Sequence, residues 1–221
     1  MKIDVNGIQL YYTKHGTGTP LVMVHCNSMS HTIFNPAIQY LKKYYTVYAL
    51  DSRGHGRSTK VDHIHYEDMA EDVYQFITKL GLEKPLYYGF SDGGIVGLIL
   101  ASGHPDLLSK MVMSGASLNP NSTVFRWQIM FRIMAVFDKS DQTQLMLREP
   151  DITDDMLHKI TVPTVLTVGI HDMIRRSHTK HIAKEVPNAV LHTYVPYGHM
   201  GYIMYRRSFG KRLKKLLEED V

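Results

Sequence analysis

Residues 89–94 form a glycine-rich stretch that reads G-F-S-D-G-G. A strand-like run precedes it at residues 86–88, and a helix-like run follows at residues 95–101. A G-x-S-x-G sequence between a strand and a helix is typical of a nucleophile elbow, in which the serine hydroxyl projects above the sheet edge. Both glycines of the motif are needed because a Cβ there is expected to collide with a neighbouring strand or helix. Ser91 is therefore the candidate nucleophile.

Length and composition indicate one ordinary soluble domain. The 221 residues are 44% hydrophobic and 21% charged, as is usual for a globular protein. No run reaches the roughly 18 consecutive apolar residues that a membrane span needs, and the first seven residues are too polar for a signal peptide. Cys26 is the one cysteine, which excludes an internal disulfide. Together these features favour a cytoplasmic setting.

The charge distribution predicts neither a nucleic-acid partner nor a membrane partner. The formal net charge is +4, and no run of lysines and arginines is interleaved with aromatic residues. The densest basic stretch, residues 211–215, precedes the acidic residues 218–220 and is interpreted as the solvated face of a final helix. Nothing in the sequence indicates the oligomeric state. The inward face of the final helix is expected to carry Phe209, Leu213, Leu216 and Leu217.

Apolar runs predict the strands. Residues 2–5 and 8–13 flank Asn6-Gly7, the favoured two-residue turn of an antiparallel hairpin. The later runs do not alternate between polar and apolar residues, which is typical of strands buried on both faces. These runs are residues 21–25, 46–50, 86–90, 110–114, 164–169 and 190–195.

Helical patterns lie between these runs, and residues 68–80 place their apolar side chains on one side of a helix. The alternation of strand and helix predicts an α/β fold with an eight-stranded, mostly parallel sheet and helices on both faces. We expect a single domain over residues 1–221. Further helices are expected at residues 95–104, 179–186 and 203–217.

One stretch, residues 118–159, interrupts the alternation after the sixth strand. It lacks strand-like runs and is rich in Met, Phe, Arg and Gln. Met130, Phe131, Met134 and Phe137 have helical spacing, for which core packing is the ordinary explanation. Little sheet is left for these residues to cover, so we favour a short helical lid over the elbow.

Two later residues complete a candidate catalytic triad with Ser91. Serine is a weak nucleophile at its own pKa and needs a base that a third group orients. His199, in the loop after the last strand, is the candidate base, and Asp172, after the strand at residues 164–169, is the candidate acid. Serine, aspartate and histidine follow one another in the order expected for this architecture.

Further short motifs accompany the elbow: G-x-G-x-P at residues 16–20, D-S-R-G-H-G-R-S at residues 51–58, Pro163-Thr164, Gly169-x-x-Asp172 and Gly198-His199. With these motifs the chain resembles the α/β-hydrolase family from end to end, and its elbow is similar to that of a subgroup of small esterases and ester-prodrug hydrolases. The resemblance implies that Ser91 attacks an acyl carbon and that His199 moves the proton. It also implies that Asp172 holds the imidazole in its useful tautomer.

The loop after the third strand departs from the pattern of that family. Many members read His-Gly there, whereas this chain reads His25-Cys26-Asn27. A backbone N–H serves whatever its side chain, so the oxyanion hole is expected to pair the N–H of Cys26 or Asn27 with that of Asp92. A side chain in place of glycine would narrow the acyl pocket or tilt the loop. Cys26 is interpreted as a small packed residue and not as a second nucleophile.

The side chain of Asp92 has two interpretations. It can stabilise the first turn of the elbow helix, or it can face the acyl pocket and select substrates that carry a cation, such as aminoacyl esters. Phe90, Met130 and Met134 are the other candidates for contact with substrate. The pairs His63-x-His65 and His178-x-x-His181 lack a third ligand of obvious spacing, so no metal is expected.

The sequence thus predicts a serine hydrolase that cleaves small, soluble carboxylic esters, aminoacyl or short-chain, through an acyl-enzyme and without a cofactor. A cofactor-free perhydrolase or a carbon–carbon bond hydrolase would use the same triad. A slow-turnover ligand sensor with a moving lid is a third alternative. Dehalogenases and epoxide hydrolases on this fold use an aspartate nucleophile, and Ser91 counts against both.

Overall fold

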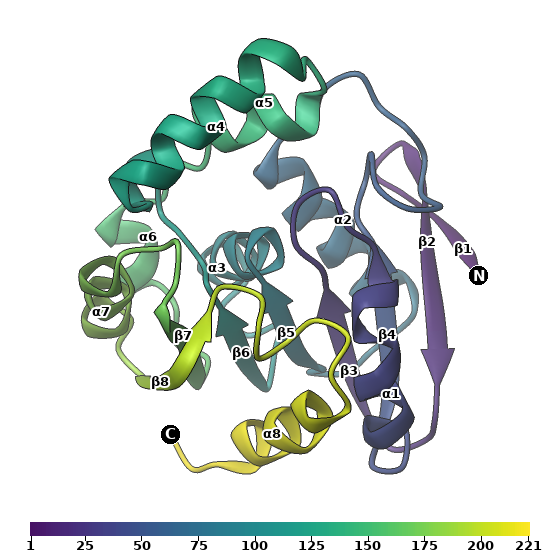
Figure 1. The fold of residues 1–221 in the computed structure, drawn as a ribbon. Helices are drawn as coiled ribbons and strands as arrows, with labels where there is room; N and C mark the ends of the chain where they lie inside the picture. Colours follow the sequence, from purple (N-terminus) through teal and green to yellow (C-terminus); the bar gives the residue numbers. More distant parts are fainter.

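The computed structural model describes residues 1–221, and its eight strands form one sheet in the order β1-β2-β4-β3-β5-β6-β7-β8 (Figure 1). Strand β2 is antiparallel to both of its neighbours, and all other adjacent pairs are parallel. The predicted eight-stranded, mostly parallel sheet is therefore confirmed. The strands are Lys2–Val5 (β1), Ile8–His15 (β2), Thr19–Val24 (β3), Tyr45–Asp51 (β4), Leu86–Phe90 (β5), Lys110–Ser114 (β6), Thr164–His171 (β7) and Ala189–Gly198 (β8).

Helices cover both faces of the sheet. Helices α1 and α8 pack together over one face, and α2 and α3 pack together over the other. The helices are Asn35–Leu41 (α1), Tyr66–Lys79 (α2), Asp92–Gly103 (α3), Phe125–Phe137 (α4), Asp141–Arg148 (α5), Asp154–His158 (α6), Arg176–Glu185 (α7) and Arg207–Glu218 (α8), with short 3-10 helices at His31–Phe34 and Pro120–Ser122.

The predicted N-terminal hairpin is present, with Val5 paired to Ile8 across a two-residue turn. Asn6 and Gly7 have φ angles of 41° and 76°. Positive φ at both central residues is the signature of a type I′ turn, whose twist matches that of the flanking strands. The turn residues therefore determine the register of the first two strands.

The central strands are buried on both faces, which explains their continuous apolar runs. On β5, Tyr87 packs into the core under α2 and α3, whereas the next residue, Tyr88, packs into the core under α1 and α8. Val22 and Met23 on β3 divide between the two cores in the same way. Because successive side chains of a strand point to opposite faces, a sheet covered on both sides needs apolar residues at every position.

The predicted helices are present with boundaries shifted by a few residues, and the largest shift is at the start of α8. Helix α8 begins at Arg207 and not at residue 203, because Tyr205 has a φ of 52° and donates its N–H to the carbonyl of Ile33 at 2.9 Å. That backbone conformation is incompatible with a continuous helix. The seven-residue helix α1 was not predicted. The inward residues predicted for the last helix, Phe209, Leu213, Leu216 and Leu217, are all buried.

The stretch after β6 is helical and contains α4, α5 and α6. Helix α6 packs against α3 and α7, and its Leu157 is fully buried in the main core, so this part belongs to the body. Helices α4 and α5, which we name the α4–α5 hairpin, lie together at the top of the view in Figure 1. Phe131 is buried there, but Met134 and Phe137 are 40% and 84% exposed, so the core explanation is wrong for these two.

Candidate active site

Three strand ends bring the candidate catalytic residues together. Ser91 directly follows β5, Asp172 directly follows β7, and His199 directly follows β8. These strands are parallel and lie within the continuous order β5-β6-β7-β8. The carboxyl ends of parallel strands meet at one edge of a sheet, where open α/β sheets bind their ligands. Residues far apart in the sequence therefore converge at this edge.

Ser91 has the strained backbone that its motif predicts. Its φ is 53° and its ψ is −109°, a region that residues with a Cβ rarely adopt. The N–H of Ser91 donates to the carbonyl of Ser114 on β6 at 2.8 Å. Its carbonyl accepts from the N–H groups of Gly94 and Ile95 at 2.8 and 3.0 Å. The turn between β5 and α3 is thus held by hydrogen bonds on both sides.

The two glycines of the motif sit where no side chain fits. A Cβ on Gly89 would lie 2.1 Å from the carbonyl oxygen of Gly93, at the start of α3. A Cβ on Gly93 would lie 2.2 Å from the carbonyl oxygen of Val24 at the end of β3. The collisions expected from the sequence are therefore present, and they allow the elbow helix to pack directly against the sheet.

Asp172 holds the imidazole of His199. The Nδ1 atom of His199 lies 2.7 Å from Oδ1 of Asp172, to which it donates a hydrogen bond. The same carboxylate accepts from the N–H groups of Ile174 and Gly169 at 2.9 and 3.4 Å, and its side chain is fully buried. This arrangement selects the tautomer with hydrogen on Nδ1, which leaves Nε2 of His199 free to accept a proton.

The ring of His199 lies against the elbow. A Cβ on Gly115, which follows β6, would come within 2.5 Å of the His199 Cε1 atom. The Phe90 ring, next to Ser91 in the chain, has its centroid 5.1 Å from that of the imidazole. No hydrogen bond joins Ser91 Oγ to the ring in this structure, and such catalytic contacts often tighten only when substrate binds. The structure places the fully buried Phe90 under the imidazole.

Unpaired backbone N–H groups lie around the elbow. The N–H groups of Cys26, Asn27 and Asp92 have no hydrogen-bond partner in the protein. Asp92 is the first residue of α3, so its N–H has no partner within the helix. The two loops are joined by a hydrogen bond of 3.1 Å from the N–H of Gly93 to the carbonyl of His25. Both pairs considered from the sequence, with Cys26 or with Asn27, remain available for an oxyanion.

His25 fixes the loop that carries these N–H groups. Its Nδ1 donates to the carbonyl of Cys26 at 2.7 Å, and its Nε2 accepts from the N–H of Ser52 at 3.1 Å. Burial, with the neighbouring His55, lowers the pKa of His25 to about 4. Burial, with the charge of Asp92, raises the pKa of Cys26 to about 12, so its thiol stays protonated at neutral pH.

Buried neutral histidines predict a loss of stability in mild acid. Burial also lowers the pKa of His178 to about 4, and its Nε2 accepts from the N–H of Leu118 at 3.0 Å. In the unfolded chain both rings return to a pKa near 6.5. The unfolded state therefore binds more protons between pH 6.5 and 4, and the free energy of unfolding falls as the pH falls through that window.

We expect His25 alone to cost about 2–3 kcal/mol of unfolding free energy at about pH 4.5, at roughly 1.4 kcal/mol for each unit of pKa. His178, which is less buried, contributes less. Urea unfolding at pH 7 and pH 4.5 measures the loss, and His178→Gln should have a shallower pH dependence than the wild type. An unfolding free energy that is constant across this range would contradict the assignment of neutral buried rings.

Asp92 is buried beside the elbow with one unpaired oxygen. Its Oδ1 accepts from the hydroxyl of Tyr66, the first residue of α2, at 3.0 Å. Its Oδ2 is buried and has no hydrogen-bond partner. Burial raises the pKa of Asp92, and nearby His55 opposes that rise. Tyr66 belongs to no motif, so no sequence signal marks this contact.

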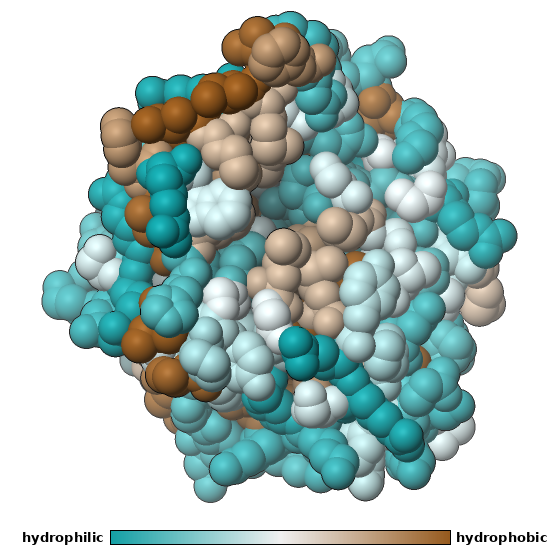
Figure 2. Space-filling model, viewed as in Figure 1, coloured by the Kyte–Doolittle hydropathy of each residue, from teal (hydrophilic) through white to brown (hydrophobic).

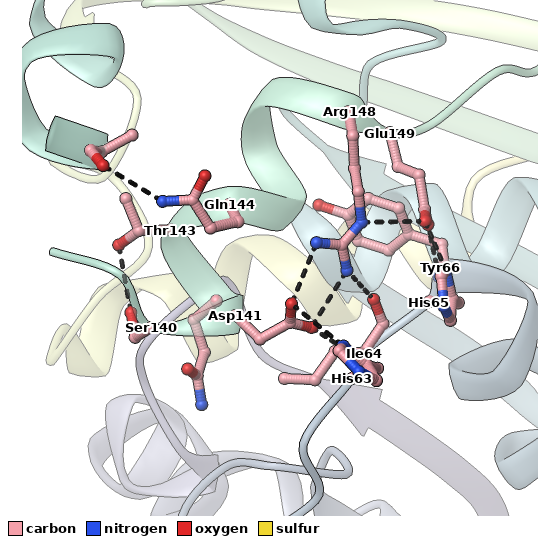
Figure 3. A network of polar contacts seen from close by, with 12 residues as sticks. His63, Ile64, His65, Tyr66, Ser140, Asp141, Thr143, Gln144, Arg148 and Glu149 are labelled. Atoms are coloured by element: carbon pink, nitrogen blue, oxygen red, sulfur yellow. Dashed lines mark hydrogen bonds and ion pairs between the residues drawn. The ribbon is translucent and has the colours of Figure 1, made fainter.

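The α4–α5 hairpin is fastened to the segment that leads into α2 (Figure 3). Arg148 donates to both carboxylate oxygens of Asp141, at 2.9 and 3.0 Å, and to the carbonyl of Ile64 at 2.6 Å. The N–H of Ile64 in turn donates to Asp141. Glu149 accepts from the N–H of Tyr66 at 3.0 Å and from the His65 ring at 2.6 Å. We name these contacts the α5 clamp.

The residues predicted to contact substrate, and the histidine pairs considered as metal ligands, make no hydrogen bond to Ser91, Asp172 or His199. Met130 and Met134 are on α4, half-buried and exposed respectively. His181 pairs with Asp154 at 2.7 Å, and His65 belongs to the α5 clamp. No group of three or more His, Cys, Asp or Glu side chains is arranged to hold a metal.

The elbow at Ser91 and the pairing of His199 with Asp172 are the arrangement expected of a serine hydrolase. A family model described as the alpha/beta hydrolase fold matches residues 19–135, and the chain belongs to this family. The chain is a hydrolase of that family.

Curated relatives agree with this family. The human protein named "Serine hydrolase BPHL" is 26% identical over an alignment of 249 positions, gaps included. The alignment covers 98% of this chain and 86% of the relative. The pimeloyl-[acyl-carrier protein] methyl ester esterase of Vibrio atlanticus is 30% identical over 108 residues, which cover 49% of this chain and 40% of the relative.

Among solved structures, the esterase EaEST from Exiguobacterium antarcticum superposes with a TM-score of 0.81 at 22% identity, over 99% of both chains. The likeness to this structure, at such low identity, shows the shared fold.

Proposed function

We propose that this protein is a serine hydrolase that cleaves small carboxylic esters through an acyl-enzyme. The observation that carries the proposal is the 2.7 Å hydrogen bond between His199 and Asp172, next to a serine held in a strained elbow conformation. The names of the relatives, a serine hydrolase and two esterases, support the same class of reaction.

The proposed reaction starts when Ser91 Oγ attacks the acyl carbon and Nε2 of His199 takes its proton. The resulting imidazolium is stabilised by the buried carboxylate of Asp172. The oxyanion accepts hydrogen bonds from the N–H of Asp92 and from that of Cys26 or Asn27. His199 then gives the proton to the leaving alcohol. Water, deprotonated by the same imidazole, hydrolyses the acyl-enzyme.

We propose that the α4–α5 hairpin is a short lid that borders the acyl pocket, with Met130 and Met134 as candidates for contact with substrate. The α5 clamp supports this arrangement because it connects α5 to Tyr66, whose hydroxyl contacts Asp92. Figure 2 shows a hollow in the surface below α4. The last part of the stretch, α6, belongs to the body and is outside this proposed lid.

A substrate panel tests the proposed reaction. We expect the highest kcat/KM with acetyl and butyryl esters of 4-nitrophenol, and little turnover of peroxide with acetate or of a carbon–carbon cleavage substrate. Ser91→Ala, measured in parallel, subtracts the background hydrolysis. Faster cleavage of a carbon–carbon bond than of any ester would favour the rival hydrolase, and turnover near zero on all substrates would favour the ligand sensor.

Asp92 supports a narrower substrate class, esters that carry a free amine. Its buried Oδ2 accepts no hydrogen bond of ordinary length, although the Asn27 side chain lies close enough to lower the pKa of the carboxyl, and a substrate ammonium would supply a donor. We expect wild-type protein to prefer an alanyl ester over its propionyl analogue, and Asp92→Asn to lower that preference by about tenfold or more.

The preference should also depend on pH. Burial raises the pKa of Asp92 above its ordinary value of 3.8, so the carboxylate and the preference appear together as the pH rises through that raised pKa. The preference should fall again when the substrate amine loses its proton at about pH 7.7–8.0. Equal ratios of alanyl-ester to propionyl-ester hydrolysis in the wild type and in Asp92→Asn at every pH would contradict this narrower proposal. The assignment of the triad would be unaffected.

A further inference from the structure

Helix α4 carries an apolar stripe that no other part of the protein covers. In Figure 2 brown and tan side chains run along the outer edge of the molecule where α4 lies in Figure 1. Contiguous exposed apolar patches mark sites that bind another molecule or a membrane. The stripe consists of Phe125, Ile129, Ile133, Val136 and Phe137, which share one helix face and are 68%, 42%, 55%, 62% and 84% exposed.

The stripe points outward because the opposite face of α4 is already packed. Phe131 and Ala135 on that face are buried, and Gln144 of α5 donates to the carbonyls of Ala135 and Asp138 at 3.2 and 3.1 Å. The α5 clamp in turn holds α5 to residues 63–66 (Figure 3). Rotating α4 to bury its stripe would break these contacts, so the exposed orientation belongs to the folded state.

The charges on the helix are all positive. Residues 125–137 contain no acidic side chain. Arg126 and Arg132 are exposed and take part in no ion pair or hydrogen bond. The exposed Asp138 caps the C-terminal end of the helix, and Lys139 follows it, with its Nζ donating to the carbonyl of Ala135 at 2.9 Å. Aromatic and aliphatic residues combined with arginine are typical of helices that lie in the interface of anionic membranes.

A second copy of the chain fits this face less well. In a two-fold pairing of α4 with itself, Arg132 near the middle of the stripe would face its own copy, and like charges repel. A helix of 13 residues is also only about 20 Å long. Its single face provides less area than the roughly 800 Å² per partner that a stable interface buries. Charge and area both favour a lipid surface.

We propose that α4 docks the protein on an anionic lipid surface, with the α4 stripe inserted among the acyl chains and with Arg126 and Arg132 at the headgroups. No helix of the protein is long and apolar enough to cross a bilayer, so α4 lies in the plane of the interface. The proposal departs from the expectation of no membrane partner, which rested on the modest net charge and on the interpretation of residues 211–215 as the solvated face of the final helix. It is independent of the proposed reaction.

Sedimentation with sucrose-loaded vesicles tests the docking. Wild-type protein should bind vesicles of phosphatidylcholine with phosphatidylglycerol more tightly than vesicles of phosphatidylcholine alone, and added salt should weaken the difference. Ile133→Ser/Phe137→Ser should lower binding at least about tenfold to both. Arg126→Gln/Arg132→Gln should lower binding to the anionic vesicles by about 25-fold, at about fivefold for each arginine. Val195→Ser, which changes a 65% exposed residue on β8, should bind as the wild type does.

Three results would overturn the proposal. The first is the absence of wild-type binding to either vesicle at low salt. The second is equal binding by the wild type and Ile133→Ser/Phe137→Ser. The third is a wild-type dimer in analytical ultracentrifugation that Ile133→Ser/Phe137→Ser dissociates, which would assign the stripe to a second copy. The arginine variant changes only exposed side chains, so its result decides the question even if the serine variant is unstable.

Discussion

Ser91→Ala is expected to lower kcat/KM for 4-nitrophenyl acetate by about ten-thousandfold to a millionfold. The substitution removes the atom that forms the acyl-enzyme, and only the contacts to the oxyanion and to the bound substrate remain. The elbow should survive because its hydrogen bonds use the backbone of residue 91. Steady-state kinetics, corrected for contaminating esterase, measures the effect.

Ser109→Ala is the matched control, since Ser109 is exposed and lies in the loop before β6. It should keep the wild-type rate. Circular dichroism and the Tm should show both variants folded. Turnover by Ser91→Ala within tenfold of the wild type would mean that another residue carries the reaction.

Asp172→Asn is expected to lower kcat by about a thousandfold to ten-thousandfold. The buried carboxylate accepts from Nδ1 of His199 at 2.7 Å and stabilises the imidazolium that forms when Ser91 attacks. An asparagine side chain is neutral, and its amide can donate to Nδ1, which selects the wrong tautomer of the ring. The loss should appear in kcat with little change in KM, because Asp172 does not contact substrate.

Asp151→Asn, at an exposed position, is the matched control for this substitution and should leave kcat unchanged. Asp172→Asn keeps an oxygen for the N–H of Ile174, so the loop should remain in place. A folded Asp172→Asn variant with nearly full activity would remove Asp172 from the proposed triad.

Local sequence patterns predicted the sheet well because each strand shows its environment in its own residues. Strands β5 and β6 have the predicted bounds, since both faces of these strands are buried and their residues, apart from Lys110, are apolar, aromatic or small. The first hairpin was predicted from Asn6 and Gly7, because their positive φ angles are required by the turn itself. Such features depend on neighbours a few residues away.

Features that depend on distant contacts were not predicted. Tyr205 makes the last helix begin later than expected because its N–H bonds to the carbonyl of Ile33, far away in the sequence. The stripe on α4 has ordinary helical spacing, and only the tertiary structure shows that Ile133 and Phe137 face outward. Arg148 and Glu149 bind residues more than 80 positions earlier in the chain, and no local motif marks them.

In the candidate site too, the residues marked by local motifs were predicted and those set by distant contacts were not. Ser91 carries a motif, and the loop positions of Asp172 and His199 follow from the order of strands, so all three were selected from sequence. Tyr66 was missed because its contact with Asp92 joins two separate helices. The choice between Cys26 and Asn27 depends on the position of an oxyanion that neither residue type determines.

Covalent labelling tests whether Ser91 is the nucleophile of this protein. The protein is treated with a fluorophosphonate, digested, and the modified peptide is sequenced by mass spectrometry. We predict one phosphonyl group on Oγ of Ser91, complete loss of ester hydrolysis in proportion to labelling, and no labelling of Ser91→Ala. Labelling of a different residue, or full activity in protein whose Ser91 is completely modified, would show that Ser91 is not the nucleophile.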